Sequence, residues 1–225
     1  MQEFKNITHT FEPVFDENSK ILILGTFPSV KSRENHFYYG HPQNRFWKVM
    51  AAVTDSPLPQ SVEEKKAFLL QNRIAVWDVI HSCSIEGSSD SSITDVVPND
   101  FTELFARTHL LAVAANGTKA YELYQKYVYP VTKREIIKMP STSPANAAWN
   151  LARLTAAYRE LKKSVMADEK PPLRISHRPF ETDCLETGIN INFLMKFIGN
   201  YCAEFPANSQ IINIGTKNII TKQRF

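Results

Sequence analysis

The sequence predicts an α/β protein whose parallel sheet is covered by helices on both faces. Short apolar runs typical of buried strands alternate along the chain with longer segments of helical periodicity. This alternation favours a parallel sheet, because a helix between two strands returns the chain to the end of the sheet where it started. The 225 residues are enough for one domain with a sizeable core and an appendage.

Four apolar runs are predicted to be the strands of this sheet. They are Ile21–Leu24, Ile74–Ile80, Leu110–Ala115 and Glu135–Met139. Runs with little polar alternation are typical of strands that are buried on both faces.

Helical patterns lie between and after these strands. The predicted helices are residues 44–53, a segment that begins at Ser61, residues 118–127 and residues 147–163. In the first of them, Phe46 and Trp47 lie on the apolar side and are expected in the core. Glu64 follows Ser61 by three residues, which is the spacing of a capping box.

The composition is that of an ordinary globular protein, with 43% hydrophobic and 22% charged residues. A net charge of +3 permits an acidic partner such as nucleic acid without requiring one. The three cysteines, Cys83, Cys184 and Cys202, are odd in number and far apart, so neither a disulfide framework nor a metal motif is expected. No signal peptide or membrane-spanning segment is predicted, and the expected location is the cytoplasm.

The character of the chain changes near residue 165. Residues 167–172 are typical of a linker. We therefore predict one domain over residues 1–166 and a C-terminal extension of unknown role over residues 167–225. The extension is too short to be trusted as an independent domain and is expected to pack on the main one. Within it, helical spacing from Leu194 to Tyr201 predicts a helix, and residues 211–220 a hairpin.

Small and polar residues are concentrated in the loops that follow the predicted strands. These loops are residues 25–47, 81–92, 116–118 and 140–146. Because the carboxyl ends of parallel strands meet at one edge of a sheet, the four loops are expected to converge on one site.

The loop over residues 38–47 combines aromatic residues with one His, one Asn and one Arg, which suits a pocket for a flat polar ring beside a phosphate. Tyr39 can stack on a nucleobase, and Asn44 can hold a base edge or position a water. Arg45 either pairs with a phosphate or simply caps a surface. His41 either orients a ligand or is structural.

The loop over residues 140–144 leaves backbone N–H groups and hydroxyls available for phosphate oxygens. The helix expected after Asn146 adds its positive N-terminal end. The alternative is a plain N-terminal cap, because Ser and Thr are favoured there. Asp90, in the loop over residues 88–92, either borders the pocket or caps a turn.

Three of these segments, taken in order, resemble the uracil-DNA glycosylase superfamily. They are Gly25–Ser29, His41–Trp47 and Met139–Pro144. The closest match is the hypoxanthine-DNA glycosylase branch, and the resemblance covers about residues 10–165. The individual motifs are short, and their order and spacing make the signal strong.

The resemblance implies a three-layer α/β/α sandwich with a central four-stranded, mainly parallel sheet. It implies a monofunctional enzyme of base excision repair that flips a deaminated base out of DNA and hydrolyses its N-glycosidic bond. The implied base is hypoxanthine, with uracil as a further candidate. No metal or cofactor is implied, and the expected partner of this monomer is double- or single-stranded DNA with deaminated bases.

The resemblance also assigns roles to residues. Asn44 takes the catalytic, water-positioning role, because Phe27 occupies the place that many relatives fill with Asp or Asn. The implied base-binding residues are Gly25, Thr26, Phe27, Tyr39 and His41, with Tyr39 stacking on the base. The implied DNA-binding residues are Pro28, Ser29, Pro140, Ser141, Thr142, Ser143, Pro144 and Asn146. Met139 stands where the main uracil enzymes carry a His.

Two other functions stay open from the residues alone. The apolar Phe27 also suits a non-catalytic module that binds nucleic acid or lesions on the same fold. A hydrolase of free nucleosides is the third candidate, although the Ser-rich loops suit phosphate-bearing DNA better.

Overall fold

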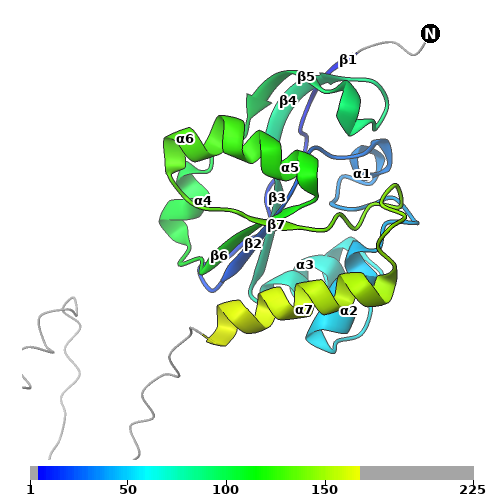
Figure 1. Cartoon of the computed structure of the whole chain (residues 1–225), viewed down its shortest axis with the longest axis vertical. Helices are drawn as coiled ribbons and strands as arrows, with labels where there is room; N and C mark the ends of the chain where they lie inside the picture. The colour runs from blue at the N-terminus through cyan, green and yellow to red at the C-terminus, as the bar shows by residue number, and fades with distance from the viewer. Residues whose placement is uncertain (1–4, 168–225) are drawn as a thin grey trace, which may run out of the picture. The chain divides into compact units, whose positions relative to one another are not determined.

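A computed structural model describes residues 5–167 of the chain (Figure 1). These residues belong to the first of two compact units, Met1–Leu173. The predicted extension, with its expected helix and hairpin, lies outside the described residues apart from Ala167. Its packing and the domain boundary stay predictions.

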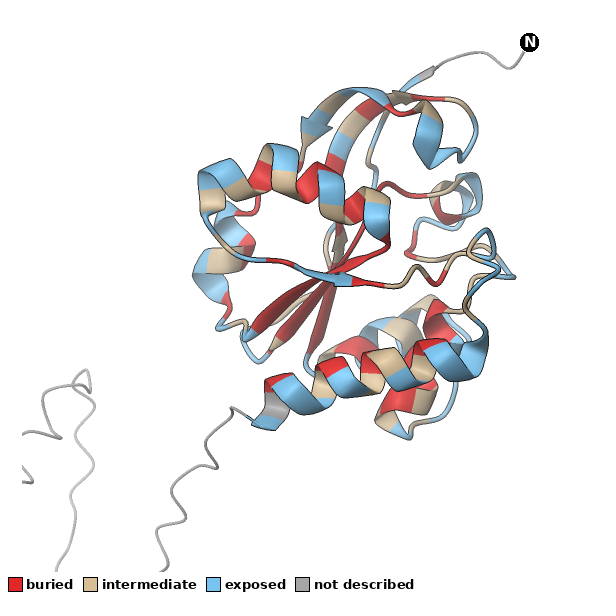
Figure 2. Ribbon diagram, in the orientation of Figure 1, coloured by how far each residue is buried: buried red, intermediate tan, exposed pale blue. Residues whose placement is uncertain are grey.

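A four-stranded parallel sheet forms the centre of the domain, which confirms the predicted architecture. Its order is β3 (Ile74–Asp78), β2 (Ile21–Gly25), β6 (Ala112–Asn116) and β7 (Ile137–Met139). Every residue of β2 and β6 is buried, as Figure 2 shows by the red colour of the two strands. The side chains of β2 therefore contribute to core clusters on both faces of the sheet.

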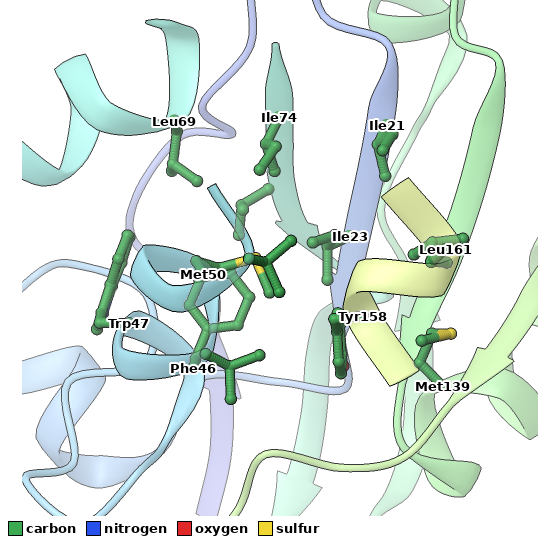
Figure 3. Close-up of a cluster of buried hydrophobic side chains, with 14 of the residues drawn as sticks. Ile21, Ile23, Phe46, Trp47, Met50, Leu69, Ile74, Met139, Tyr158 and Leu161 are labelled. Carbon is green, nitrogen blue, oxygen red and sulfur yellow. The ribbon is translucent and has the colours of Figure 1, made fainter. Parts of the chain in front are cut away.

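Three helices cover one face of this sheet (Figure 1). They are α2 (Phe46–Thr54), α3 (Val62–Gln71) and α7 (Leu151–Ala167). The core between them and the sheet contains Ile21 and Ile23 of β2 beside Phe46 of α2 and Tyr158 of α7 (Figure 3). The predicted capping box begins α3, with the Ser61 hydroxyl 3.0 Å from the Glu64 N–H and the Glu64 carboxylate 3.3 Å from the Ser61 N–H.

The other face packs against a second group of elements. They are α4 (Thr102–Arg107), α5 (Thr118–Leu123), the π-helical turn Tyr124–Val128 and α6 (Tyr129–Thr132). Leu22 and Leu24 of β2 face this group and pack with Leu104 and Tyr124. The alternation along β2 thus fills both cores, and the three layers predicted from the resemblance are confirmed.

A three-stranded antiparallel sheet was not predicted. It joins β1 (Lys5–Thr8), β4 (Ile80–Ile85) and β5 (Thr94–Pro98). The predicted strand Ile74–Ile80 ends at Asp78, and residues 81–85, expected to be loop, continue as β4. The reason is that a half-buried strand rich in His and Ser has the composition of a loop, although Cys83 and Ile85 alternate toward the core.

No described helix is long and apolar enough to cross a membrane.

Candidate active site

The carboxyl ends of the parallel strands open into a cavity of about 490 Å³. Its lining comes from the loops after β2, β4 and β7 and from the last residues of β3 and β6. The convergence of loops expected from the sequence is therefore present. Predicted site residues on the lining are Gly25, Thr26, Phe27, Pro28, Ser29, Tyr39, His41, Asn44, Ser141, Thr142, Ser143 and Pro144. Pro140 and Asn146 line an adjacent depression that shares Ser141 and Ser143 with the cavity.

Asn44 has a fixed orientation at the start of α2. Its Oδ1 accepts hydrogen bonds from the Phe46 N–H (3.0 Å) and from the Thr142 hydroxyl (2.9 Å). A backbone N–H can only donate, so the amide atom that it meets is the oxygen. The Asn44 Nδ2 group makes no hydrogen bond with the described residues and is the polar group left for the cavity.

Thr142 is fully buried and is held in turn by Asn116 at the end of β6. The Thr142 N–H donates to Asn116 Oδ1, and Asn116 Nδ2 donates to the Thr142 hydroxyl, both at 2.9 Å. The Tyr158 hydroxyl of α7 lies 3.0 Å from the same Asn116 oxygen. Asn116 and Tyr158 were not predicted as site residues. Asn116 had a detectable signal, because it is the polar residue that directly follows the predicted apolar run Leu110–Ala115.

Arg45 connects the two predicted motifs. Its Nε donates to the Thr142 carbonyl (3.2 Å) and its guanidinium to the carbonyls of Ser143, Asn146 (3.1 Å) and Trp149. The structure thus gives Arg45 neither of the two roles considered from the sequence, since its donors hold the loop over residues 141–149 in place.

The hydroxyls of that loop are engaged in local turns. The Ser143 N–H donates to the Ser141 hydroxyl (3.2 Å), and the Ala145 N–H donates to the Ser143 hydroxyl (3.3 Å). The helix expected from residue 147 begins only at Leu151, where Asn150 accepts a hydrogen bond from the Arg153 N–H (2.9 Å). The later start follows from this cap, because a side-chain oxygen satisfies an N–H of the first turn.

Gly25 and Asp78 meet at the floor of the cavity. They are paired in register at the ends of β2 and β3. A Cβ at Gly25 would lie 2.2 Å from Asp78 Oδ1, so only glycine leaves room for this carboxylate. Asp78 is 4% exposed and lines the cavity, and its Oδ1 has no hydrogen bond from the described residues.

His9 fixes the other oxygen of Asp78. Its Nε2 lies 3.0 Å from Asp78 Oδ2. Nδ1 of the same ring accepts a long hydrogen bond of 3.5 Å from the Phe11 N–H, which places the proton of the neutral ring on Nε2. His9 carried no signal in the sequence, whereas Asp78 is a polar residue within an apolar run.

Tyr39 is one wall of the cavity. Its ring stacks on Phe46 with centroids 3.8 Å apart. The hydroxyl is buried and forms no hydrogen bond with the described residues, although the Asn116 side chain lies near it. Burial and the charge of Asp78 raise the pKa of Tyr39, so the phenol stays protonated at neutral pH.

Asp90 and His41 complete the lining. The Thr26 hydroxyl donates to Asp90 Oδ2 at 3.2 Å, and desolvation raises the pKa of this carboxyl. Asp90 therefore borders the pocket. His41 Nδ1 accepts a local hydrogen bond from the Gln43 N–H at 3.2 Å. Phe27 offers the cavity an aromatic ring and no polar side-chain group.

The described residues contain no group of three or more His, Cys, Asp and Glu side chains that could hold a metal ion.

Known proteins resemble this chain over most of the described domain. The family model of the uracil DNA glycosylase superfamily matches residues 12–162. A protein of Methanosarcina acetivorans named hypoxanthine DNA glycosylase is 38% identical over 149 residues, which are 65% of this chain and 93% of that protein. A protein of the same name from Methanosarcina barkeri is 39% identical over 115 residues, 50% of this chain and 72% of that protein. The solution NMR structure of a candidate uracil DNA glycosylase from M. acetivorans has a TM-score of 0.57 and 36% identity, and the match covers 68% of this chain and 96% of that one.

Proposed function

The chain belongs to the uracil DNA glycosylase superfamily and is a DNA N-glycosylase, and we propose that its substrate is deoxyinosine, from which it removes hypoxanthine. The observation that carries this choice of base is the open carboxylate oxygen of Asp78 at the cavity floor. The names of the two curated relatives support the same base.

Asp78 suits the edge that deamination creates in a base. Hypoxanthine presents a ring N–H beside a carbonyl, whereas adenine presents a ring nitrogen acceptor beside an amino group. An ionised carboxylate only accepts hydrogen bonds. Asp78 Oδ1 would therefore pair with the N–H of hypoxanthine and oppose the ring nitrogen of adenine. Uracil has an N–H between its two carbonyls and is a second candidate substrate of the same site.

The base reaches the cavity only after it leaves the duplex. Unstacking costs a few kcal/mol and is easiest for mismatched bases. We infer that the flipped base stacks on Tyr39, whose ring is supported from behind by Phe46. Gly25, Thr26, Phe27 and His41 would surround it.

The DNA backbone would contact Pro28, Ser29, Pro140, Ser141, Ser143, Pro144 and Asn146. Thr142, which was predicted with them, is fully buried and would not reach it. The hydroxyls of Ser141 and Ser143 already accept local hydrogen bonds, so each offers its proton to a phosphate. Arg45 holds the loop over residues 140–144 in a single arrangement before DNA arrives, which reduces the entropy lost on binding.

Cleavage is hydrolysis at C1′ of the deoxyribose. The bond between C1′ and the base breaks with its electron pair on the base, and the sugar acquires cationic character. A water oxygen then bonds to C1′, and the proton that the water loses balances the charge of the departing base. We propose that Asn44 holds this water. Because Asn44 Oδ1 is already occupied, its Nδ2 would donate to the water oxygen and leave another lone pair free to attack.

A cleavage panel tests this function. Duplexes that carry one deoxyinosine or one deoxyuridine are incubated with the protein and treated with alkali, which breaks the strand at abasic sites. We expect cleavage at deoxyinosine, and a loss of about 10²- to 10³-fold in Asn44→Ala with DNA binding retained. The control Asn18→Ala changes an exposed residue before β2, at the opposite end of the sheet. Lesion binding without release of any base would indicate the non-catalytic alternative instead.

A further inference from the structure

We propose that Thr142 is a positioning residue that fixes the Asn44 amide with its nitrogen toward the cavity, and that Asn116, itself in contact with Tyr158, holds Thr142 in place. The proposal rests on the proposed function, because it assumes that Asn44 acts in cleavage. It assigns a role in the reaction to three residues on different elements that do not themselves touch the reacting atoms.

Chemistry determines the direction of the hydrogen bonds that join Asn44, Thr142 and Asn116. The backbone N–H groups of Phe46 and Thr142 can only donate, so the atoms that they meet on Asn44 and Asn116 are the oxygens. The nitrogen of Asn116 must then donate to the Thr142 hydroxyl. A hydroxyl has one proton, and at Thr142 it goes to Asn44 Oδ1.

Three members of this chain of hydrogen bonds are buried, and Asn44 at its end is partly exposed. Thr142 is 0% exposed, Asn116 8% and Tyr158 2%. Between buried groups such bonds meet little competition from solvent, and a group that lost its partner would cost free energy by remaining unsatisfied. The alternative flip of the Asn44 amide would place two N–H groups against the Phe46 N–H and the Thr142 hydroxyl proton. The network therefore opposes this flip.

The orientation matters for the reaction. With Oδ1 saturated, Asn44 can offer the cavity only a donor, which fits a water that must keep a lone pair for C1′. Without the Thr142 hydroxyl, one of the two contacts that distinguish the amide ends is lost. The nitrogen would then face the cavity for a smaller fraction of the time.

Single-turnover cleavage of the deoxyinosine duplex tests this role with paired variants. Thr142→Val keeps the shape and removes the hydroxyl, whereas Thr142→Ser keeps the hydroxyl. We expect Thr142→Val to lose at least about tenfold in rate with the Kd for DNA within about twofold, and Thr142→Ser to stay within about threefold of the wild type. Thr108→Val is the control, because Thr108 is equally buried and its hydroxyl donates to the Leu104 carbonyl outside the network.

A double-mutant cycle separates positioning from general structural damage. If Thr142 acts through Asn44, Thr142→Val has no further effect in an Asn44→Ala background, as measured on the residual rate. A Thr142→Val protein with the wild-type rate would overturn the proposal. So would equal slowing of the Asn44→Ala protein and the wild type by that substitution. A wild type that cleaves no deaminated base would refute the proposed function itself, and the two failures are thus distinguishable.

Discussion

Asp78→Asn converts the open acceptor at the cavity floor into a donor. His9 Nε2–H lies 3.0 Å from Asp78 Oδ2 and would retain the amide oxygen of the variant at that position. The amide nitrogen would then occupy the place of Oδ1, beside Gly25. It would meet the ring N–H of hypoxanthine with a second donor.

The size of the effect follows from the bond that is lost. A hydrogen bond to a charged group contributes about 1.5–3 kcal/mol. At about 1.4 kcal/mol for each factor of ten, kcat/KM for deoxyinosine should fall by about 10- to 150-fold. The fold should be retained, because the His9 contact and the volume of the side chain are preserved.

The assay compares two leaving bases in otherwise identical duplexes. Single-turnover rates are measured for deoxyinosine and for deoxynebularine, a purine nucleoside that lacks both the ring N–H and the carbonyl. We expect Asp78→Asn to slow deoxyinosine selectively. Asp55→Asn, at an exposed carboxylate after α2, is the matched control. A hydrogen bond from hypoxanthine to Asp78 is refuted if Asp78→Asn keeps the wild-type rate on deoxyinosine or slows both substrates by the same factor.

Two further predictions concern other parts of the domain. Arg45→Lys should lower the free energy of unfolding by about 1–3 kcal/mol, since one ammonium group cannot reach the same carbonyls. It should also raise the rate of amide hydrogen exchange over residues 141–149. An unchanged exchange rate would show that the loop keeps its conformation without Arg45. Cys83 is buried, and burial raises the pKa of its thiol from 9.0 to about 11. The unfolded thiol therefore ionises first as pH rises past 9, and the wild type should lose more unfolding free energy between pH 9 and 11 than Cys83→Ala. Peptide mass spectrometry should find iodoacetamide on Cys83 at pH 8 only after unfolding in urea, and rapid labelling of Cys83 itself in the native protein would contradict its burial.

The sequence was sufficient for those parts of the fold that local patterns encode. Three of the four central strands, β2, β3 and β6, are almost entirely apolar, and the spacing of Ser61 and Glu64 identifies the start of α3. The antiparallel sheet escaped prediction because only one residue separates β3 from β4 and because β4 is rich in polar residues. Its half-buried alternation is recognisable only once the partner strands are known.

The candidate site was predictable to the extent that its residues lie in the loops after strands. Asn44 and Tyr39 are recognisable because they lie in a short segment that combines aromatic with polar residues. Asn116 and Asp78 end apolar strands and could have been noted on that ground. His9 could not, because its contact with Asp78 joins residues 69 positions apart, which no local pattern encodes.

The attachment of Arg45 to a loop about a hundred residues later has a consequence for the folding of this enzyme. Its partners are 97 to 104 positions away in the chain. Contacts of such sequence separation form late, because closing a long loop costs entropy before the contacts repay it. We therefore expect a nascent or partly unfolded chain to lack the arrangement around Asn44 that the proposed cleavage requires, and to release no deaminated base from DNA until the domain is folded.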